Sequence, residues 1–530
     1  MLVKNISKKS NDDIIVSWYG SKFNLIVESI IVGVLTGFVV VAFRSLIGLL
    51  GGKVLNIYKV ALLKWWIIPI MVVAFIILGC IIGIMSKNHP MIGGSGIPQV
   101  EGVILSKLKM NWLKVVVEKF VGGVLAIGAG LSLGREGPSV QLGAAIGQGV
   151  SRLFKGVNIE EKHLITSGAS AGLAAAFNAP LAGTIFALEE VHKNFSPLIL
   201  ATSFLSALSA DFITSELLGA QPIFNFSHIY SIPLRYYFYI VLFGIIIGVT
   251  GAAFNIVLLK TQDLYGKQKI IPQKYKAVVP LLVSIVFGLF LPQVLGGGNS
   301  LILDLSNVHF TMTLIFIMLI CKFFFTMICY GSGVPGGIFL PLLTIGALIG
   351  SFYGQFFTLF LHVNSYYVNN FIIMGMTGYF TAVVRSPITG IILITEMTGS
   401  FNHFLSLSIV SIIAYLVADK LGTGPIYESL LDKFLINNAG MEIRQNEQDE
   451  KTIIQVPVCL GSYLDGKVLK EIDWPCYCLI VEIKRGCHKI IPNGETIIYA
   501  GDYLTVLTDE STAGRLNDLL NEMSQSQRKI

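Results

Sequence analysis

Long apolar runs dominate the chain up to about residue 430 and show no regular alternation with polar positions. About ten such segments follow one another, and several approach the roughly 20 residues that a helix needs to cross a bilayer. Clear examples are residues 65–86, 235–258, 277–296 and 404–418 with its flanks. Other segments are short or interrupted by glycine. The pattern predicts an all-α polytopic membrane domain over residues 23–435.

The pattern changes after this domain. Residues 436–452 are polar and predict a linker. From 453 to the end at 530, short apolar runs separated by turn residues indicate a small α+β domain, which we expect to be cytoplasmic. We expect strands at 452–458, 477–486, 495–501 and 502–508, and a closing helix at 513–523.

Composition agrees with a membrane protein. Of the 530 residues, 53% are hydrophobic and only 13% are charged, whereas a soluble protein would carry about 25% charged residues. The net charge of +6 is too small to suggest a nucleic-acid partner. Lys4, Lys8 and Lys9 precede the first apolar run, so residues 1–22 are predicted to be a cytoplasmic segment. We therefore expect a multi-pass protein of the cell membrane with both termini in the cytoplasm.

Two stretches of the membrane part repeat each other. The segment "FNAPLAGTIFALEEV" at 177–191 resembles "VRSPITGIILITEMT" at 384–398. Three residue pairs share one spacing of 207 positions: Pro180 and Pro387, Gly183 and Gly390, and Glu189 and Glu396. Repeats with broken helices at matching places favour a transporter. A duplication without functional meaning is the alternative.

Three breaks interrupt the apolar pattern with small residues and proline, near residues 94, 134 and 331. Glycine lets the backbone approach a ligand, and proline suits the first helical turn. The breaks therefore predict helix N-termini inside the membrane, whose free N–H groups and partial positive charge attract anions. Packing kinks are the alternative explanation.

Glu136 lies at the second break, within "GREGP" at 134–138. A charge inside the bilayer costs at least about 2.5–3.5 kcal/mol, which favours a functional residue. At an anion-attracting helix start, its carboxylate would occupy the anion site and leave it on protonation. Glu136 is thus a candidate gate and proton carrier, the alternative being a static pair with Arg135.

Four motifs together resemble the CLC family of chloride channels and transporters: "GSGIP" at 94–98, "GREGP" at 134–138, "GGIFLP" at 336–341 and Tyr427 in "GPIYESLL". The resemblance implies two inverted repeats with re-entrant helices, a homodimer and one anion pathway in each subunit. It makes Glu136 the gating glutamate. It also implies a set of chloride-binding residues: Ser95, Gly96, Ile97, Ile338, Phe339 and Tyr427. Lys119 and Arg135 would raise the positive potential along the pathway.

The same family contains passive channels and proton-coupled exchangers. The exchangers carry a second glutamate that relays protons, and Glu190 matches that position. Glu189 matches Glu396 of the repeat and is therefore expected to be structural. The resemblance implies chloride as the anion, because Ser95 is typical of chloride-selective members. We thus predict exchange of chloride for protons, with a ligand-gated passive chloride channel as the alternative. Catalysis is not expected, because the sequence contains no HExxH motif.

The segment "IPNGETIIYAGDYLTVL" resembles RCK-C domains, also called TrkA-C domains, of potassium-transport regulators. That resemblance implies dimerisation and a regulatory ligand, for which cyclic di-AMP is the candidate; a purely structural dimerisation role is the alternative. No other cofactor is expected. Cys476, Cys478, Cys487 and His488 match no standard zinc spacing, so no metal site is predicted.

Overall fold

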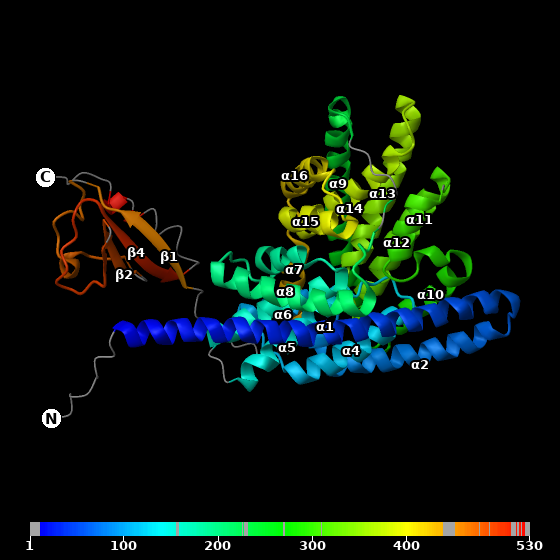
Figure 1. Cartoon of the computed structure of the whole chain (residues 1–530), viewed down its shortest axis with the longest axis horizontal. Helices are drawn as coiled ribbons and strands as arrows, with labels where there is room; N and C mark the ends of the chain where they lie inside the picture. The colour runs from blue at the N-terminus through cyan, green and yellow to red at the C-terminus, as the bar shows by residue number, and fades with distance from the viewer. Residues whose placement is uncertain are drawn as a thin grey trace. The chain divides into compact units, whose positions relative to one another are not determined.

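A computed structural model shows two compact units, Met1–Glu442 and Ile443–Ile530 (Figure 1). The structure describes residues 11–154, 158–224, 226, 232–268, 271–308, 310–437, 451–459, 461–475, 478–486, 488–509, 516, 519–520 and 522–524. Each unit has its own hydrophobic core, with Leu142 and Phe380 in the first and Val456 and Val506 in the second. The two units are described separately.

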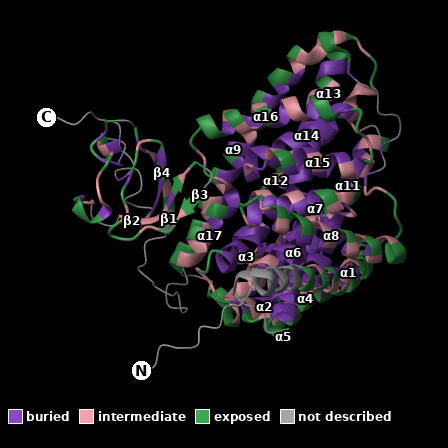
Figure 2. Ribbon diagram, turned by 60° about the vertical axis from the view of Figure 1, so that its left-hand side comes forward, coloured by how far each residue is buried: buried purple, intermediate pink, exposed green. Residues whose placement is uncertain are grey.

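The first unit is built from α-helices, and most residues on the helices in its interior are buried (Figure 2). The helices are α1 (Asn11–Leu63), α2 (Ile67–Asn88), α3 (Ile97–Ile104), α4 (Trp112–Gly128), α5 (Glu136–Leu153), α6 (Asn158–Phe177), α7 (Pro180–Phe186), α8 (Pro197–Leu218), α9 (Tyr237–Lys267), α10 (Val278–Phe290), α11 (Asn299–Asn307), α12 (Met312–Gly331), α13 (Phe339–Leu361), α14 (Tyr367–Val384), α15 (Pro387–Thr398), α16 (Phe404–Lys420) and α17 (Ile426–Asn437). A π-helical turn, η2 (Ala187–Val191), follows α7.

Seven helices among the described residues are long and apolar enough to cross a membrane. They lie at Phe23–Leu63, Ile67–Asn88, Pro197–Leu218, Leu234–Lys267, Gln273–Phe290, Met312–Gly331 and Phe339–Leu361. The remaining apolar segments form helices that are shorter, such as α15, or rich in glycine and small residues. The unit is a multi-pass membrane protein, in which only part of the helices have full membrane length.

The order of elements repeats within this unit. From α2 to α8, a long helix, a 3-10 turn η1 (Pro90–Ile92), the short α3 and five further helices follow one another. From α10 to α16 the same order returns, with η5 (Pro292–Val294) and the short α11. The repeat predicted from 177–191 and 384–398 therefore extends over both halves, and α17 follows them.

Glycines form the same contact in each repeat. Gly143 of α5 lies directly against the backbone oxygen of Gly168 in α6, and Gly346 of α13 lies against that of Gly375 in α14. A side-chain carbon at any of these four glycines would collide with the facing backbone. Small residues at such crossings allow close helix packing, which replaces the hydrophobic driving force that lipid does not supply.

The second unit contains an antiparallel four-stranded sheet in the order β1-β4-β2-β3. The strands are β1 (Lys451–Pro457), β2 (Leu479–Arg485), β3 (His488–Ile490) and β4 (Asp502–Asp509). Val506 pairs with both Ile454 and Ile480 at the centre of the sheet. This is the expected α+β domain, since the described residues of the predicted final helix, among them Leu516 and Leu520, are also helical.

The prediction of a strand at 495–501 was wrong. Its backbone groups pair with a loop instead: the N–H of Leu469 donates to Thr496, and the N–H of Ile498 donates to Lys467. At the start of this segment, Asn493 and Thr496 hydrogen-bond to each other through the Thr496 hydroxyl and form a turn. The strand β3 takes the edge of the sheet. Of the four residues with potential for metal binding, Cys476 and Cys487 lie outside the described residues.

One ion pair, between a partly exposed arginine and a buried aspartate, joins two strands of this unit. Arg485 at the end of β2 donates to both carboxylate oxygens of Asp502 at 2.8 Å. Asp502 is only 1% exposed, and the N–H of Tyr499 also donates to it. Burial alone would raise the pKa of Asp502, but the hydrogen bonds from Arg485 and Tyr499 outweigh burial and lower that pKa.

We expect Asp502→Asn to lower the free energy of unfolding of the second unit by about 1–3 kcal/mol near pH 7. The pKa of Asp502 is lower in the folded protein than in the unfolded chain, where it is about 3.9. The stability that Asp502 contributes is therefore complete above this unfolded value, and it is lost as the pH falls through the folded pKa. Limited proteolysis of the full chain across this pH range measures the difference. Glu495→Ala, which breaks the exposed pair with Lys470, is the control with little effect. Equal protease sensitivity of the Asp502→Asn variant and the wild type at pH 7 would contradict the assignment.

Candidate functional site

Three helix starts meet in the middle of the first unit. They belong to α3, α5 and α13, which begin at the breaks near residues 94, 134 and 331. Isolated bridges join Gly94 to Pro335 and Gly134 to Gly337. In the second bridge the two N–H groups donate to the opposite carbonyls at 2.7 and 2.8 Å. The structure therefore brings the three breaks to one place.

Glycine is required at this junction for two different reasons. Gly96 precedes α3 with φ of +96°, a left-handed conformation that other residues rarely adopt. A side chain there would also collide with Gln141 of α5. Gly137, in the first turn of α5, lies directly against Ser95. The missing side chains let the starts of α3 and α5 approach each other.

Two hydroxyl groups are buried here without a hydrogen-bond partner among the described residues. They are Ser95 Oγ, just before α3, and the Tyr427 hydroxyl, at the start of α17. A buried donor without an acceptor is costly, so such groups are expected to face water or a polar ligand. An anion would accept both O–H groups. Gly96 and Ile97 are also buried at the start of α3.

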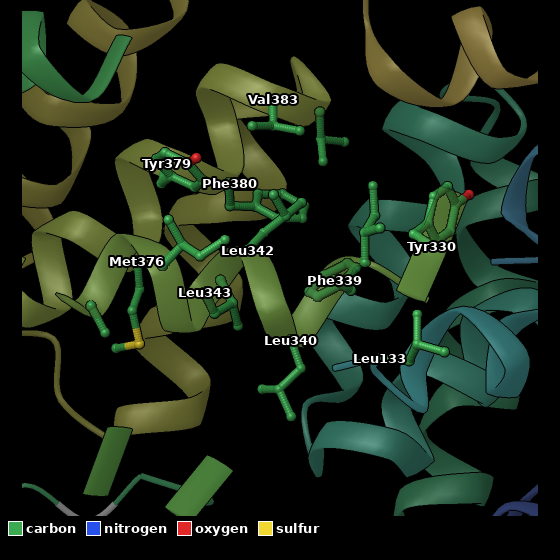
Figure 3. Packing of buried hydrophobic residues seen from close by; sticks show 14 of the residues in the cluster. Leu133, Tyr330, Phe339, Leu340, Leu342, Leu343, Met376, Tyr379, Phe380 and Val383 are labelled. Atoms are coloured by element: carbon green, nitrogen blue, oxygen red, sulfur yellow. The ribbon is translucent and has the colours of Figure 1, made fainter. Parts of the chain in front are cut away.

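The start of α13 supplies backbone N–H groups. Ile338 and Phe339 are both fully buried, and Ile338 precedes the first helical residue. The Phe339 ring packs against Phe380 of α14 with ring centres 4.7 Å apart, so its side chain is held in the apolar core (Figure 3). This anchoring leaves the Phe339 backbone, and not its ring, to face a ligand at the helix start.

Glu136 is the first residue of α5 and is 0% exposed. Its carboxylate interacts with the backbone N–H groups of Glu136 and of Leu340, so it lies between the starts of α5 and α13. Neither oxygen has a well-formed hydrogen bond among the described residues. The Nε of Arg135 lies 3.9 Å away, which is too far for a hydrogen bond. The two side chains therefore form an ion pair without a hydrogen bond.

A further arginine, which sequence reasoning missed, lies near this carboxylate. Arg44 of α1 donates to the carbonyl of Ala175 at 2.6 Å and to the side chain of Asn178 at 2.8 Å. Its charge interacts with both Arg135 and Glu136. No motif around residue 44 marks it in the sequence.

Lys119 and a second lysine bind the backbone in the same way. Lys119 is fully buried and donates to the carbonyls of Ile92 and Gly94, each at 2.8 Å. Lys322, also fully buried, donates to the carbonyls of Val294 at 3.0 Å and Gly296 at 2.6 Å. Sequence reasoning missed Lys322, although its spacing of 203 residues from Lys119 equals that between Pro138 and Pro341.

Glu190 lies in η2 and is 5% exposed. One carboxylate oxygen accepts a hydrogen bond of 2.5 Å from the Ser386 hydroxyl, and the other is buried without a partner among the described residues. Electrostatic interactions connect the Tyr427 hydroxyl with both Glu190 and Glu136. Both carboxylates therefore lie in the neighbourhood of the Tyr427 hydroxyl.

Glu189 has a different environment from its neighbour. Its carboxylate accepts hydrogen bonds from the N–H groups of Ile388 and Thr389, at 3.2 and 2.7 Å, at the start of α15. Glu396 does the reverse and accepts from the N–H groups of Leu181 and Ala182, at 3.1 and 2.7 Å, at the start of α7. Each repeat therefore caps a helix of the other, which agrees with a structural role for Glu189.

We expect Glu189→Ala and Glu396→Ala each to lower the free energy of unfolding by about 1–3 kcal/mol, because each leaves two helix-start N–H groups without an acceptor. Thermal unfolding of the purified protein in detergent measures the loss. Glu216→Ala removes an exposed carboxylate from α8 and should change stability by less than about 0.5 kcal/mol. Stabilities of all three variants equal to the wild type would contradict the reciprocal capping.

A cavity of about 590 Å³ adjoins the junction of the three helix starts. Its walls include Gly94 and Gly333 near the breaks, together with Lys87, Lys276 and Lys433. Lys433 of α17 also pairs with Asp263 at 2.5 Å. Asp263 lines the cavity as well, so its walls carry three lysines and one aspartate, a net positive charge that favours an approaching anion.

Comparison with known proteins agrees with this geometry. Residues 77–419 match the family described as voltage gated chloride channel, and residues 453–521 match the TrkA-C domain. The H(+)/Cl(-) exchange transporter ClcA of Vibrio campbellii is 34% identical over 438 residues, which cover 78% of this chain and 93% of that protein. The protein of the same name from Salmonella arizonae is 32% identical over 435 residues, covering 80% and 91%.

A solved structure described as a slow cyanobacterial Cl⁻/H⁺ antiporter is also similar. Its TM-score is 0.73 at 31% identity, and the match covers 78% of this chain and 99% of that one. The fold predicted from the sequence, two inverted repeats with broken helices and a small C-terminal α+β domain, is confirmed. With the family match over most of the membrane unit, the chain belongs to the CLC family of voltage gated chloride channels and transporters.

Proposed function

We propose that this protein exchanges chloride for protons across the membrane. The observation that carries the proposal is the Glu136 carboxylate, which is fully buried at the meeting point of three helix starts and has no well-formed hydrogen bond among the described residues. A carboxylate in that position competes with an anion for the same N–H and O–H donors. The relatives named H(+)/Cl(-) exchange transporters support the assignment.

Chloride binds where the donors converge. The hydroxyls of Ser95 and Tyr427 donate to it, and the helix starts at Gly96, Ile97, Ile338 and Phe339 surround it with N–H groups and partial positive charge. Lys119 fixes the backbone before α3 by binding the carbonyl of Gly94. With Arg135 it adds positive potential along the pathway.

Protons use the two buried carboxylates. Glu136 blocks the anion path when it is charged and leaves the donors when it is protonated, because the neutral acid no longer competes for them. Glu190 passes protons between Glu136 and the cytoplasm. Tyr427, which interacts with both, lies beside the route. Movement of a proton and of chloride is coupled because both require Glu136 to change place.

The second unit regulates this exchange. Its TrkA-C match and its position after α17, the helix that carries Tyr427, support the role. We assign it a small regulatory ligand, with cyclic di-AMP as the candidate, and expect the chain to act as a homodimer. Adding cyclic di-AMP to the reconstituted protein tests this assignment by a change in the exchange rate.

Proteoliposomes with a chloride gradient and equal pH on both sides test the proposal. In an exchanger, the chloride gradient drives protons across the membrane and so creates a pH difference. Protons then continue to move against this pH difference. We expect such uphill proton movement from the wild-type protein. Chloride flux without proton movement would instead identify a passive channel.

A further inference from the structure

The strongest unexplained feature near the proposed proton route is the hydroxyl of Ser386. It is 1% exposed and donates to Glu190 at 2.5 Å across 196 residues of sequence. An O–H···O hydrogen bond of this length lies at the short end of the ordinary range. Ser386 comes from the second repeat, whereas Glu190 comes from the first. The contact therefore joins a residue of the second repeat to the proposed proton-carrying residue of the first.

The position of Ser386 in its helix makes this contact unusual. Ser386 is the residue before α15, where a serine normally caps the helix by accepting a backbone N–H. Here the side chain makes no such cap among the described contacts of α15, because Glu189 already accepts the N–H groups of Ile388 and Thr389. The Ser386 hydroxyl therefore donates its hydrogen bond to Glu190 and takes no part in capping α15.

The first repeat shows that a helix of this kind starts without a serine. Position 179, the repeat equivalent of 386, is Ala179, and α7 begins after it with the same Pro at the next residue. Glu396 caps α7 just as Glu189 caps α15. The serine hydroxyl is thus unnecessary for the helix start and requires another explanation.

The other groups around Glu190 are charged or titratable. Lys193 follows in the same segment, and it bonds to Glu101 of α3 at 2.5 Å and to Glu428 of α17. These three charges act on Glu190, and the Tyr427 hydroxyl does so from α17. Among the described residues, Ser386 alone donates a hydrogen bond to the Glu190 carboxylate.

We infer that Ser386 is a positioning residue for proton transfer, an inference that rests on the proposed exchange function. By binding one oxygen of Glu190, it fixes the rotation of the carboxylate. The second oxygen, which has no partner among the described residues, then faces the proton route in one orientation. Proton transfer needs such alignment, since it occurs only over hydrogen-bond distances or through one water.

The test compares Ser386→Ala, Ser386→Thr and Ser411→Ala in proteoliposomes, with chloride and proton fluxes recorded together. Ser411 is the matched control, since it is a buried serine that contacts Pro387 and Thr381 near the same helix start but not Glu190. We expect Ser386→Ala to lower the proton-to-chloride flux ratio about 10-fold while chloride flux is retained. Ser386→Thr, which restores a hydroxyl, should regain the wild-type ratio, and Ser411→Ala should keep it.

Two results would overturn the inference. An unchanged ratio in Ser386→Ala would show that the hydroxyl does not position Glu190. A ratio in Ser386→Thr as low as in Ser386→Ala would show that the residue acts through packing and not through its hydroxyl. If the wild-type protein itself moves no protons, the exchange function fails, and that outcome is distinct from both results.

Discussion

Glu136→Ala is expected to abolish proton transport completely while chloride continues to pass. The substitution removes the carboxylate that lies between the starts of α5 and α13, and leaves the donors of Ser95 and Tyr427 in place. Without a group that both carries a proton and blocks the anion path, the two fluxes become independent. Simultaneous recording of chloride efflux and proton uptake from proteoliposomes measures the effect.

Glu118→Ala is a suitable control for this variant. Glu118 is a partly exposed carboxylate of α4 that pairs with His89 at 3.1 Å. We expect it to leave the proton-to-chloride ratio unchanged. Proton transport that persists in Glu136→Ala would remove Glu136 from the mechanism, and a loss of chloride flux would show that the carboxylate maintains the anion path instead of gating it.

Glu190→Val should stop proton movement and spare chloride flux. Valine cannot bind a proton, so the route between Glu136 and the cytoplasm is interrupted, whereas the anion donors lie elsewhere. Glu189→Ala is the matched comparison, because it removes the adjacent carboxylate, which caps α15. We expect Glu189→Ala to keep proton coupling despite its lower stability. Measurement of both fluxes for the two variants separates the roles.

The outcome for this pair is decisive for the assignment of the relay. If Glu190→Val moves protons at the wild-type rate, Glu190 is not the relay. If Glu189→Ala loses coupling and Glu190→Val retains it, the two roles have been exchanged. The different hydrogen-bond partners of the two carboxylates predict neither result.

The sequence predicted the features that local chemistry determines. Glycine and proline at the three breaks fix where α3, α5 and α13 begin, and the polarity of a helix start indicates an anion. The repeat of Glu189 and Glu396 also indicated a structural pair, although not that each glutamate caps a helix of the other half. That crossing depends on how the two repeats face each other, which spacing along one chain does not show.

Contacts between distant segments could not be predicted. Ser386 and Glu190 are far apart in the sequence, and no motif around either residue indicates their hydrogen bond. Lys322 was missed for a different reason, since a lysine within an apolar run carries no motif and only its distance from Lys119 indicates its role. In the second unit, residues 495–501 looked like a strand because their apolar pattern suits one, but a loop takes their hydrogen bonds.

The voltage at which net flux reverses tests the central claim most directly. In proteoliposomes with fixed chloride and pH gradients, a passive channel reverses at the chloride equilibrium potential and ignores pH. An exchanger reverses at a voltage that depends on both gradients, because each transport cycle moves both ions. We predict that a change in the pH gradient alone shifts the reversal voltage of the wild-type protein and leaves that of Glu190→Val at the chloride equilibrium potential. A wild-type reversal voltage that does not respond to the pH gradient would contradict the exchange of chloride for protons.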